Sequence, residues 1–250
     1  MAPDRGTIRP RMMRASTLDV LSRAVQDGDV AGHDEAWAEL VEAGVATADR
    51  QLLPHWRELL TGASQAPVRF DVESRMGRAG MRSLISLTAR YGLSITERRR
   101  LTVTDTEIVV DAVEDVVEVA LFEPADIWPA VQRVLPPSHL VRADGGSNPR
   151  DERTVGILRD APERSAMPED LLADLAGADV EVHLMLQVDN GTDLPFVTTR
   201  HWLEGGRDQL LEVRLLEGSV EVVRVPTGTI ADEVVWLTVG AHDIRSRTVA

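Results

Sequence analysis

The spacing of apolar residues divides the chain into helical and strand-like segments. In the first third of the sequence apolar residues recur every three or four positions, and Pro54 falls where the first turn of a helix tolerates its missing N–H. This spacing predicts helices over residues 18–25, 34–43 and 52–60. From Val68 the spacing becomes two, which predicts strands over residues 68–74, 82–89, 100–105, 107–113 and 116–122.

A similar order of elements follows in the second part of the chain. A helix is predicted over residues 125–137, and residues 142–153 are rich in turn formers. A helix over residues 168–177, four strands and a last helix over residues 229–240 come next, although the β-branched residues of the last segment would suit a strand equally well. The links between successive strands are short, so we expect antiparallel pairing.

Two stretches at the helix-to-strand junctions resemble one another. Residues 58–72 read ELLTGASQAPVRFDV and residues 170–184 read DLLADLAGADVEVHL, which places Leu59 on Leu171 without a gap. Such self-similarity also arises by chance, but the shared order of elements favours a duplication. We therefore predict an α+β fold of two quasi-symmetric halves, each an antiparallel sheet flanked by helices. The predicted organisation is a disordered tail (1–13), an N-terminal half (14–141), a linker (142–153) and a C-terminal half (154–250).

Composition narrows the classes of function. The formal charge of -14 disfavours nucleic acid and anionic membrane surfaces, both of which attract clustered cations. The chain has no cysteine, which excludes disulfides, thiolate metal sites and thiol nucleophiles. All 27 basic residues are arginine, a feature we attribute to codon bias. Neither a signal peptide nor an apolar run long enough to span a membrane is present, so we expect a cytoplasmic protein without membrane insertion.

No constellation of catalytic residues stands out. The six histidines form no metal-binding pair, and we interpret His183 as a polar residue on the solvent face of a strand. His242 and Asp243 are adjacent, which directs them to opposite sides of an extended chain. The acidic run over residues 111–126 alternates with valines and is typical of a solvated strand rather than a Ca²⁺ loop. We predict no catalytic residue, no cofactor and no metal site, and the protein is not expected to be an enzyme.

Protein binding is the function that remains. Residues 74–82 and 90–100 are rich in Arg, Met and Tyr, which interfaces enrich, and we interpret the first segment as a mobile loop. The alternative is that these arginines only solubilise the chain and that the methionines tuck under the sheet. The predicted partner-binding residues are Met76, Arg78, Met81, Arg82, Tyr91, Arg98, Leu171 and Leu175.

Several segments resemble a known family. The order of elements over residues 30–240, with Ala36-Trp37-Ala38-Glu39-Leu40 in the first part and Trp202-Leu203-Glu204-Gly205-Gly206-Arg207 in the second, resembles the EspG family of ESX (type VII) secretion-associated proteins of actinobacteria. The resemblance implies two quasi-symmetric α/β halves and no cofactor. It also implies a cytosolic chaperone or adaptor that covers the aggregation-prone tip of a helical secretion substrate of the PE–PPE type. The region between the halves, residues 142–178, is shorter than in the family.

Two other classes of function stay open at this point. An acidic, cysteine-free α+β chain could act as an immunity or antitoxin protein that binds a basic toxin. A hydrolase using Asp and His is the third possibility, for which His183, His201 and His242 would be the residues to test.

Overall fold

The first part of the chain is a strand followed by three helices. The computed structural model describes residues 8–26, 30–104, 107–146, 155–159, 166–191 and 194–248. Strand β1 (Arg9–Arg14) leads into α1 (Ala15–Val25), α2 (Asp34–Glu42) and α3 (Pro54–Ser64). Pro54 opens α3 as predicted, because the first helical residue has no intrahelical use for its N–H.

Four long strands and a short helix come next. They are β2 (Val68–Met76), β3 (Ala79–Leu87), β4 (Gly92–Val103) and β5 (Ile108–Phe122), followed by the 3₁₀ turn η1 (Pro124–Asp126) and α4 (Ile127–Gln132). The segments predicted as separate strands over 107–113 and 116–122 are one strand, because no glycine or proline interrupts β5. At the two ends of the turn predicted over residues 104–107, Thr104 N–H donates to the Glu107 carbonyl at 2.9 Å, and residues 105 and 106 lie outside the described residues.

The remaining elements follow in the predicted order, except that β6 (Val155–Arg159) was not predicted from the sequence. They are β6 (Val155–Arg159), α5 (Glu169–Ala176), β7 (Val180–Val188), β8 (Phe196–Gly205), β9 (Gln209–Leu216), β10 (Ser219–Val225) and α6 (Thr229–Thr248). The last segment is therefore a helix despite its β-branched residues, because Ile230, Val234 and Leu237 fall on one buried side. Of the predicted linker, residues 147–153 lie outside the described residues.

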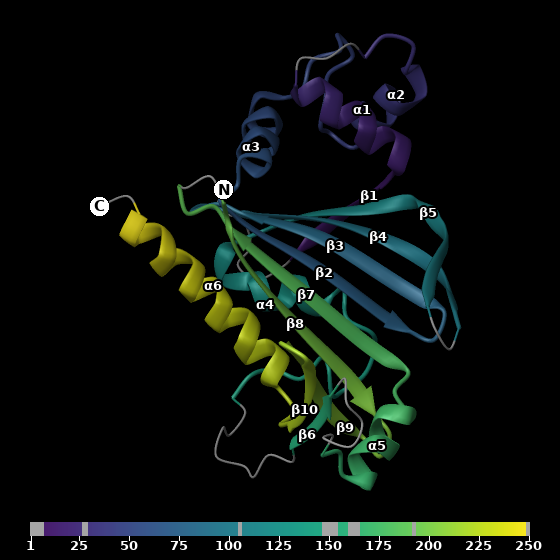
Figure 1. Cartoon of the computed structure of the whole chain (residues 1–250). Coiled ribbons are helices and arrows are strands. Elements are labelled where there is room, and N and C mark those ends of the chain that lie inside the picture. Colours follow the sequence, from purple (N-terminus) through teal and green to yellow (C-terminus); the bar gives the residue numbers. More distant parts are fainter. Residues whose placement is uncertain are drawn as a thin grey trace.

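All ten strands form one antiparallel sheet, with the order β1-β5-β4-β3-β2-β7-β8-β9-β10-β6 (Figure 1). The prediction of two halves with a sheet each is therefore wrong. The two strands expected to lie in different halves, β2 and β7, pair along their full length from Val68↔Val188 to Met76↔Val180. This pairing satisfies the backbone groups of both strands, which two separate sheets would leave exposed at their edges.

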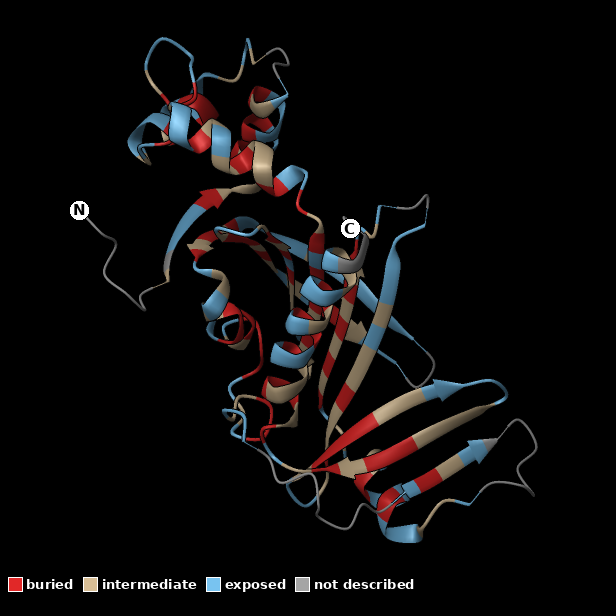
Figure 2. Ribbon diagram, turned by 90° about the vertical axis from the view of Figure 1, so that its left-hand side faces the viewer, coloured by how far each residue is buried: buried red, intermediate tan, exposed pale blue. Residues whose placement is uncertain are grey.

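One face of the sheet packs against α4 and α6. Phe70 and Val72 of β2 and Leu184 of β7 are buried with apolar residues of both helices in the largest core cluster. These side chains occupy alternate positions of their strands, so the intervening residues point to the opposite face. Figure 2 shows the buried residues along the central strands and on the inner side of α6.

The opposite face is covered only at its two sides. Helices α1 to α3 pack over β4 and β5, where Leu93, Val117 and Val119 join their core cluster. Helix α5 packs over β8 to β10, where Leu171, Leu211 and Val222 are buried together. Between these two helical layers, the middle strands β3, β2 and β7 present one face without a described helix over it.

Part of the predicted N-terminal tail is a strand. Residues 9–14 pair with β5 from Leu121 to Val116, so the prediction of disorder is wrong for residues 9 to 13. Met13 is buried in the N-terminal helical cluster, and the Arg14 backbone N–H donates to Glu39 Oε1 at 3.0 Å. Three arginines and one proline concealed this strand, since edge strands tolerate both residue types. Residues 1–7 lie outside the described part.

None of the helices in the described part of the chain combines the length and the apolar content that crossing a membrane requires.

Candidate functional site

A groove runs along β2 and β7 on the face that the helices leave open. Its floor consists of residues at alternate positions, with Arg69, Asp71, Glu73 and Arg75 on β2 and their partners Gln187, Met185, His183 and Glu181 on β7. Residues 69 to 75 span about 20 Å of extended chain, which equals the length of a helix of about 13 residues. Figure 1 shows these strands with no helix drawn across their middle. We call this surface the sheet groove.

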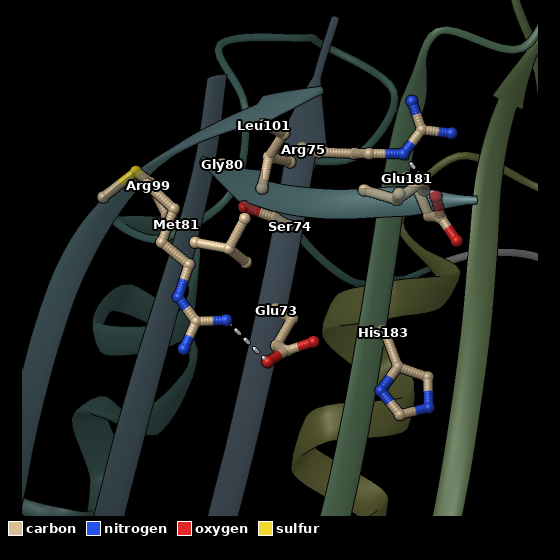
Figure 3. Close-up of a pocket in the computed structure, with 11 residues that line it drawn as sticks. Glu73, Ser74, Arg75, Gly80, Met81, Arg99, Leu101, Glu181 and His183 are labelled. Carbon is tan, nitrogen blue, oxygen red and sulfur yellow. Dashed lines mark hydrogen bonds and ion pairs between the residues drawn. The ribbon is translucent and has the colours of Figure 1, made fainter. Parts of the chain in front are cut away.

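Two hollows lie end to end in the sheet groove. One, of about 420 Å³, lies beside the C-terminal end of α3 and has Leu84, Met185 and Gln187 on its floor. The other, of about 230 Å³, is lined by charged residues of β2, β4 and β7 and by Leu101, Ile108 and Val110 of the β4–β5 hairpin (Figure 3). One end of the groove is therefore largely apolar and the other is charged.

The charged end is an ion-pair network. Arg99 joins Glu73 at 3.1 Å, and Arg82 joins Asp71 at 2.5 Å where the two hollows meet. Arg75 pairs with Glu181 on the neighbouring strand, and Figure 3 shows this contact beside the Arg99–Glu73 pair. Because each arginine is held by a carboxylate, the floor presents fixed charges of both signs rather than a patch of one sign.

Two histidines extend the network across β7 and β8. His183 and His201 are directly opposite in the strand register, with ring centroids 6.1 Å apart. His201 Nε2 lies 2.7 Å from Glu181 Oε1. The hydrogen bond with His201, followed by that from Arg75, outweighs burial and lowers the pKa of Glu181 from 4.5 to about 2.

The depressed pKa of Glu181 gives a pH-dependent prediction. As the pH falls below 4.5, Glu181 is protonated in the unfolded chain before it is protonated in the folded chain. The ionised Glu181 side chain therefore stabilises the fold above pH 4.5, and this stabilisation is lost as the pH falls towards about 2. We expect Glu181→Gln to lower the free energy of unfolding by about 2 kcal/mol at neutral pH, because Arg75 loses its charged partner. Urea unfolding at neutral pH and near the lower end of this window measures the effect. The difference between wild type and variant should shrink at acid pH, and an equal difference at both values would contradict the assignment.

Residues 202–207, the second segment that resembles the EspG family, help to attach α5 to the sheet. Trp202 is fully buried in the main core. A Cβ on Gly205 would lie 3.0 Å from the Asp174 Cβ, so glycine permits the close approach of α5. Arg207 has a φ of 62° and donates from Nε to Asp174 Oδ1 at 2.8 Å. These residues hold α5 against the end of β8.

The first predicted binding segment is a tight hairpin and not a mobile loop. Residues 74–76 belong to β2 and 79–82 to β3, with Gly77 at a φ of 57° in the turn. Met76 and Arg78 are exposed at this tip, whereas Met81 is partly buried against the core and borders the charged hollow. Arg82 pairs with Glu73 in the strand register, so of this set it is Arg82 whose side chain lies on the groove face.

The other predicted binding residues lie elsewhere. The Tyr91 hydroxyl donates to the Leu59 carbonyl at 2.7 Å, which attaches β4 to α3. Arg98 is exposed on the face of β4 opposite to Glu97 and Arg99. Leu171 is fully buried and Leu175 packs against the same cluster, so these two leucines hold α5 in place. The prediction that Leu171 contacts a partner is therefore wrong.

The residues of the groove floor were largely missed from the sequence. Glu181, His183 and Met185 occupy every second position of β7, and Arg69 to Arg75 do so on β2. This alternation was visible, and the interpretation of His183 as a polar residue on an open strand face agrees with its position. What the sequence did not indicate was that β2 and β7 are neighbours.

The acidic side chains of the groove are held in place by their neighbours. No group of three His, Asp or Glu side chains in the described part of the chain is placed to hold a metal ion. The carboxylates of the groove are committed to arginines or to His201. The arrangement is suited to contact another molecule through a mixed polar and apolar surface.

Comparisons with known proteins do not assign the chain to a family. No protein-family model matches the chain, and no curated protein matches it. Among solved structures, the crystal structure of an N-terminal dehydratase from the difficidin assembly line is a weak match, with 9% sequence identity and a TM-score of 0.14. The match covers 91% of this chain and 97% of the dehydratase chain. A likeness at this level carries no argument about fold or activity.

Proposed function

We propose that this chain is an EspG-like binding protein that keeps a helical type VII (ESX) secretion substrate of the PE–PPE type soluble in the cytoplasm. The observation that supports this function is the sheet groove, an open strip about as long as a helix of 13 residues between two helical layers. The resemblance of residues 36–40 and 202–207 to the family points in the same direction.

The chemistry of the groove fits an amphipathic helix. Leu84 and Val197, each 49% exposed, offer apolar contacts at one end, and Met185 lies between them. The fixed ion pairs at the other end offer hydrogen-bond donors and acceptors that would set the direction of the bound helix. A partner that covers the groove would also cover the inner side of the β4–β5 hairpin at Ile108 and Val110. The exposed apolar tip of a secreted helical hairpin requires such a cover until export.

Co-expression with the small helical proteins encoded beside the gene tests this proposal. We expect one of them to co-elute with the chain on size exclusion, at low and at physiological salt. Leu84→Glu should weaken the complex at least about 30-fold, because it places a charge on the apolar floor. Leu215→Glu is the matched control, since Leu215 is 83% exposed on β9, outside the groove, and its complex should be unchanged.

The opposite results would reject the proposal. Failure of every neighbouring helical protein to co-elute would contradict the EspG-like role. Equal affinity of the Leu84→Glu and wild-type proteins would remove the groove from the interface. Capture of a basic toxin instead, through a complex that dissociates at high salt, would favour the immunity class.

A further inference from the structure

Strand β5 is longer than the strand on its outer side. β1 pairs with residues 116–121 of β5, whereas β4 pairs with β5 from Ile108 onwards on the inner side. Among the described residues, no strand pairs with the outer edge of residues 108–115. This open edge is about 26 Å long at the usual rise of a strand. Figure 1 shows β5 beside β4 at the side of the sheet away from α6.

The open edge carries exposed apolar side chains. Ile108, Val109, Val110 and Val113 are between 43% and 49% exposed, and all are β-branched. Natural sheets usually protect an edge of this kind with lysine, proline or a covering element, because it pairs readily with another chain. Residues 107–115 contain neither lysine nor proline. The protection that the edge does have comes from acidic side chains and from the register shifts of β5 against β4, so the edge is open to a strand of opposite charge.

The charge of the edge indicates what kind of strand it accepts. Asp111, Glu114 and Asp115 are exposed on β5, and residues 107–115 contain no basic residue. The cations Arg98 and Arg100 lie one strand inward, on β4. A second copy of this chain would bring two acidic edges together, which electrostatic repulsion disfavours. A basic segment is complementary to the edge.

We propose that the outer edge of residues 108–115 binds an extended basic segment of another protein as an added strand, end to end with β1. The backbone of that segment would supply the hydrogen bonds that β1 supplies to residues 116–121. In the bound segment, β-branched residues would alternate with arginines or lysines. The β-branched residues would cover Val109 or Val110, and the cations would face the carboxylates of β5. This site is the outer backbone edge of β5, of which only the side chains of Ile108 and Val110 also border the sheet groove. It does not depend on the proposed chaperone role.

A labelled peptide of alternating arginine and valine tests the site. Fluorescence anisotropy with the full chain should show binding that weakens with salt, and amide exchange should slow at residues 108–115. A peptide with proline in place of valine keeps the charge but cannot donate along the strand, and it should bind at least about tenfold more weakly. Equal binding of the two peptides would overturn the proposal, because attraction would then be purely electrostatic.

Variants of the chain separate this site from others. The triple variant Asp111→Asn, Glu114→Gln and Asp115→Asn should bind the arginine–valine peptide at least about tenfold more weakly. The control carries Glu42→Gln, Asp49→Asn and Glu217→Gln, which remove the same charge from exposed positions elsewhere and should leave affinity unchanged. Leu84→Glu should also leave it unchanged, so failure of the edge site and failure of the groove can be told apart. Equal loss in the triple variant and its control, or protection confined to the groove, would refute the proposal.

Discussion

Replacing Asp174 with alanine is expected to lower the free energy of unfolding by about 3 kcal/mol. The Asp174 carboxylate is fully buried, and it accepts hydrogen bonds from Arg207 Nε at 2.8 Å and from Arg224 Nη2 at 2.6 Å. Its loss removes several charge-assisted bonds and leaves Arg224, whose side chain is 20% exposed, without its buried partner. Helix α5 would then lose its main polar attachment to β10.

Urea unfolding followed by circular dichroism measures this effect. Asp170→Asn is the matched control, because Asp170 also pairs with Arg224 but is 48% exposed, and solvent screens that pair. We expect the control to unfold close to the wild type. If Asp174→Ala were no more destabilised than Asp170→Asn, the buried attachment of α5 would be refuted.

Replacing Trp202 with alanine is expected to cost about 4 kcal/mol. Trp202 is fully buried in the main core and pairs with Val182 on β7 and Glu212 on β9. Its indole N–H has no hydrogen-bond partner among the described residues, so its contribution is apolar packing. Trp202→Phe should therefore cost only about 1 kcal/mol, since a phenyl ring fills most of the space and leaves no polar group unpaired.

Equilibrium unfolding of both variants provides the measurement. Because the core of β7 and β8 continues into β2, we also expect Trp202→Ala to shift one cooperative transition of the whole chain. A loss as large for phenylalanine as for alanine would show that the indole N–H is bonded. A separate early transition of the C-terminal part would contradict the single core.

Local elements could be predicted from the sequence, but the pairing at the centre of the sheet could not. The periods of α3, β2, α5 and β7 are clear because each element has one buried side. The strands β2 and β7, however, lie more than a hundred positions apart, and their alternation fits an edge strand as well as a central one. The sequence therefore indicated repeated segments, and two separate sheets were the wrong way to assemble them.

The candidate site was mostly hidden for the same reason. Arg75 and Glu181 become a pair only when β2 and β7 are neighbours. Composition favours the Met-rich and Arg-rich segments as binding sites, but of their residues Arg82 lies on the groove face and Tyr91 packs against α3. Leu171 looked like a contact residue because one face of a short helix is apolar, and that face is the one that packs on the sheet.

Photo-crosslinking of the complex tests the central claim, that the sheet groove holds a protein partner. The crosslinker benzoylphenylalanine is introduced at Thr199, which is exposed and pairs with Met185 on the groove side of β8, or at Trp236, which is 63% exposed on α6. These two positions lie on opposite faces of the sheet. We predict that the co-purified helical partner crosslinks from Thr199 and not from Trp236. Crosslinks from Trp236 alone would contradict the account.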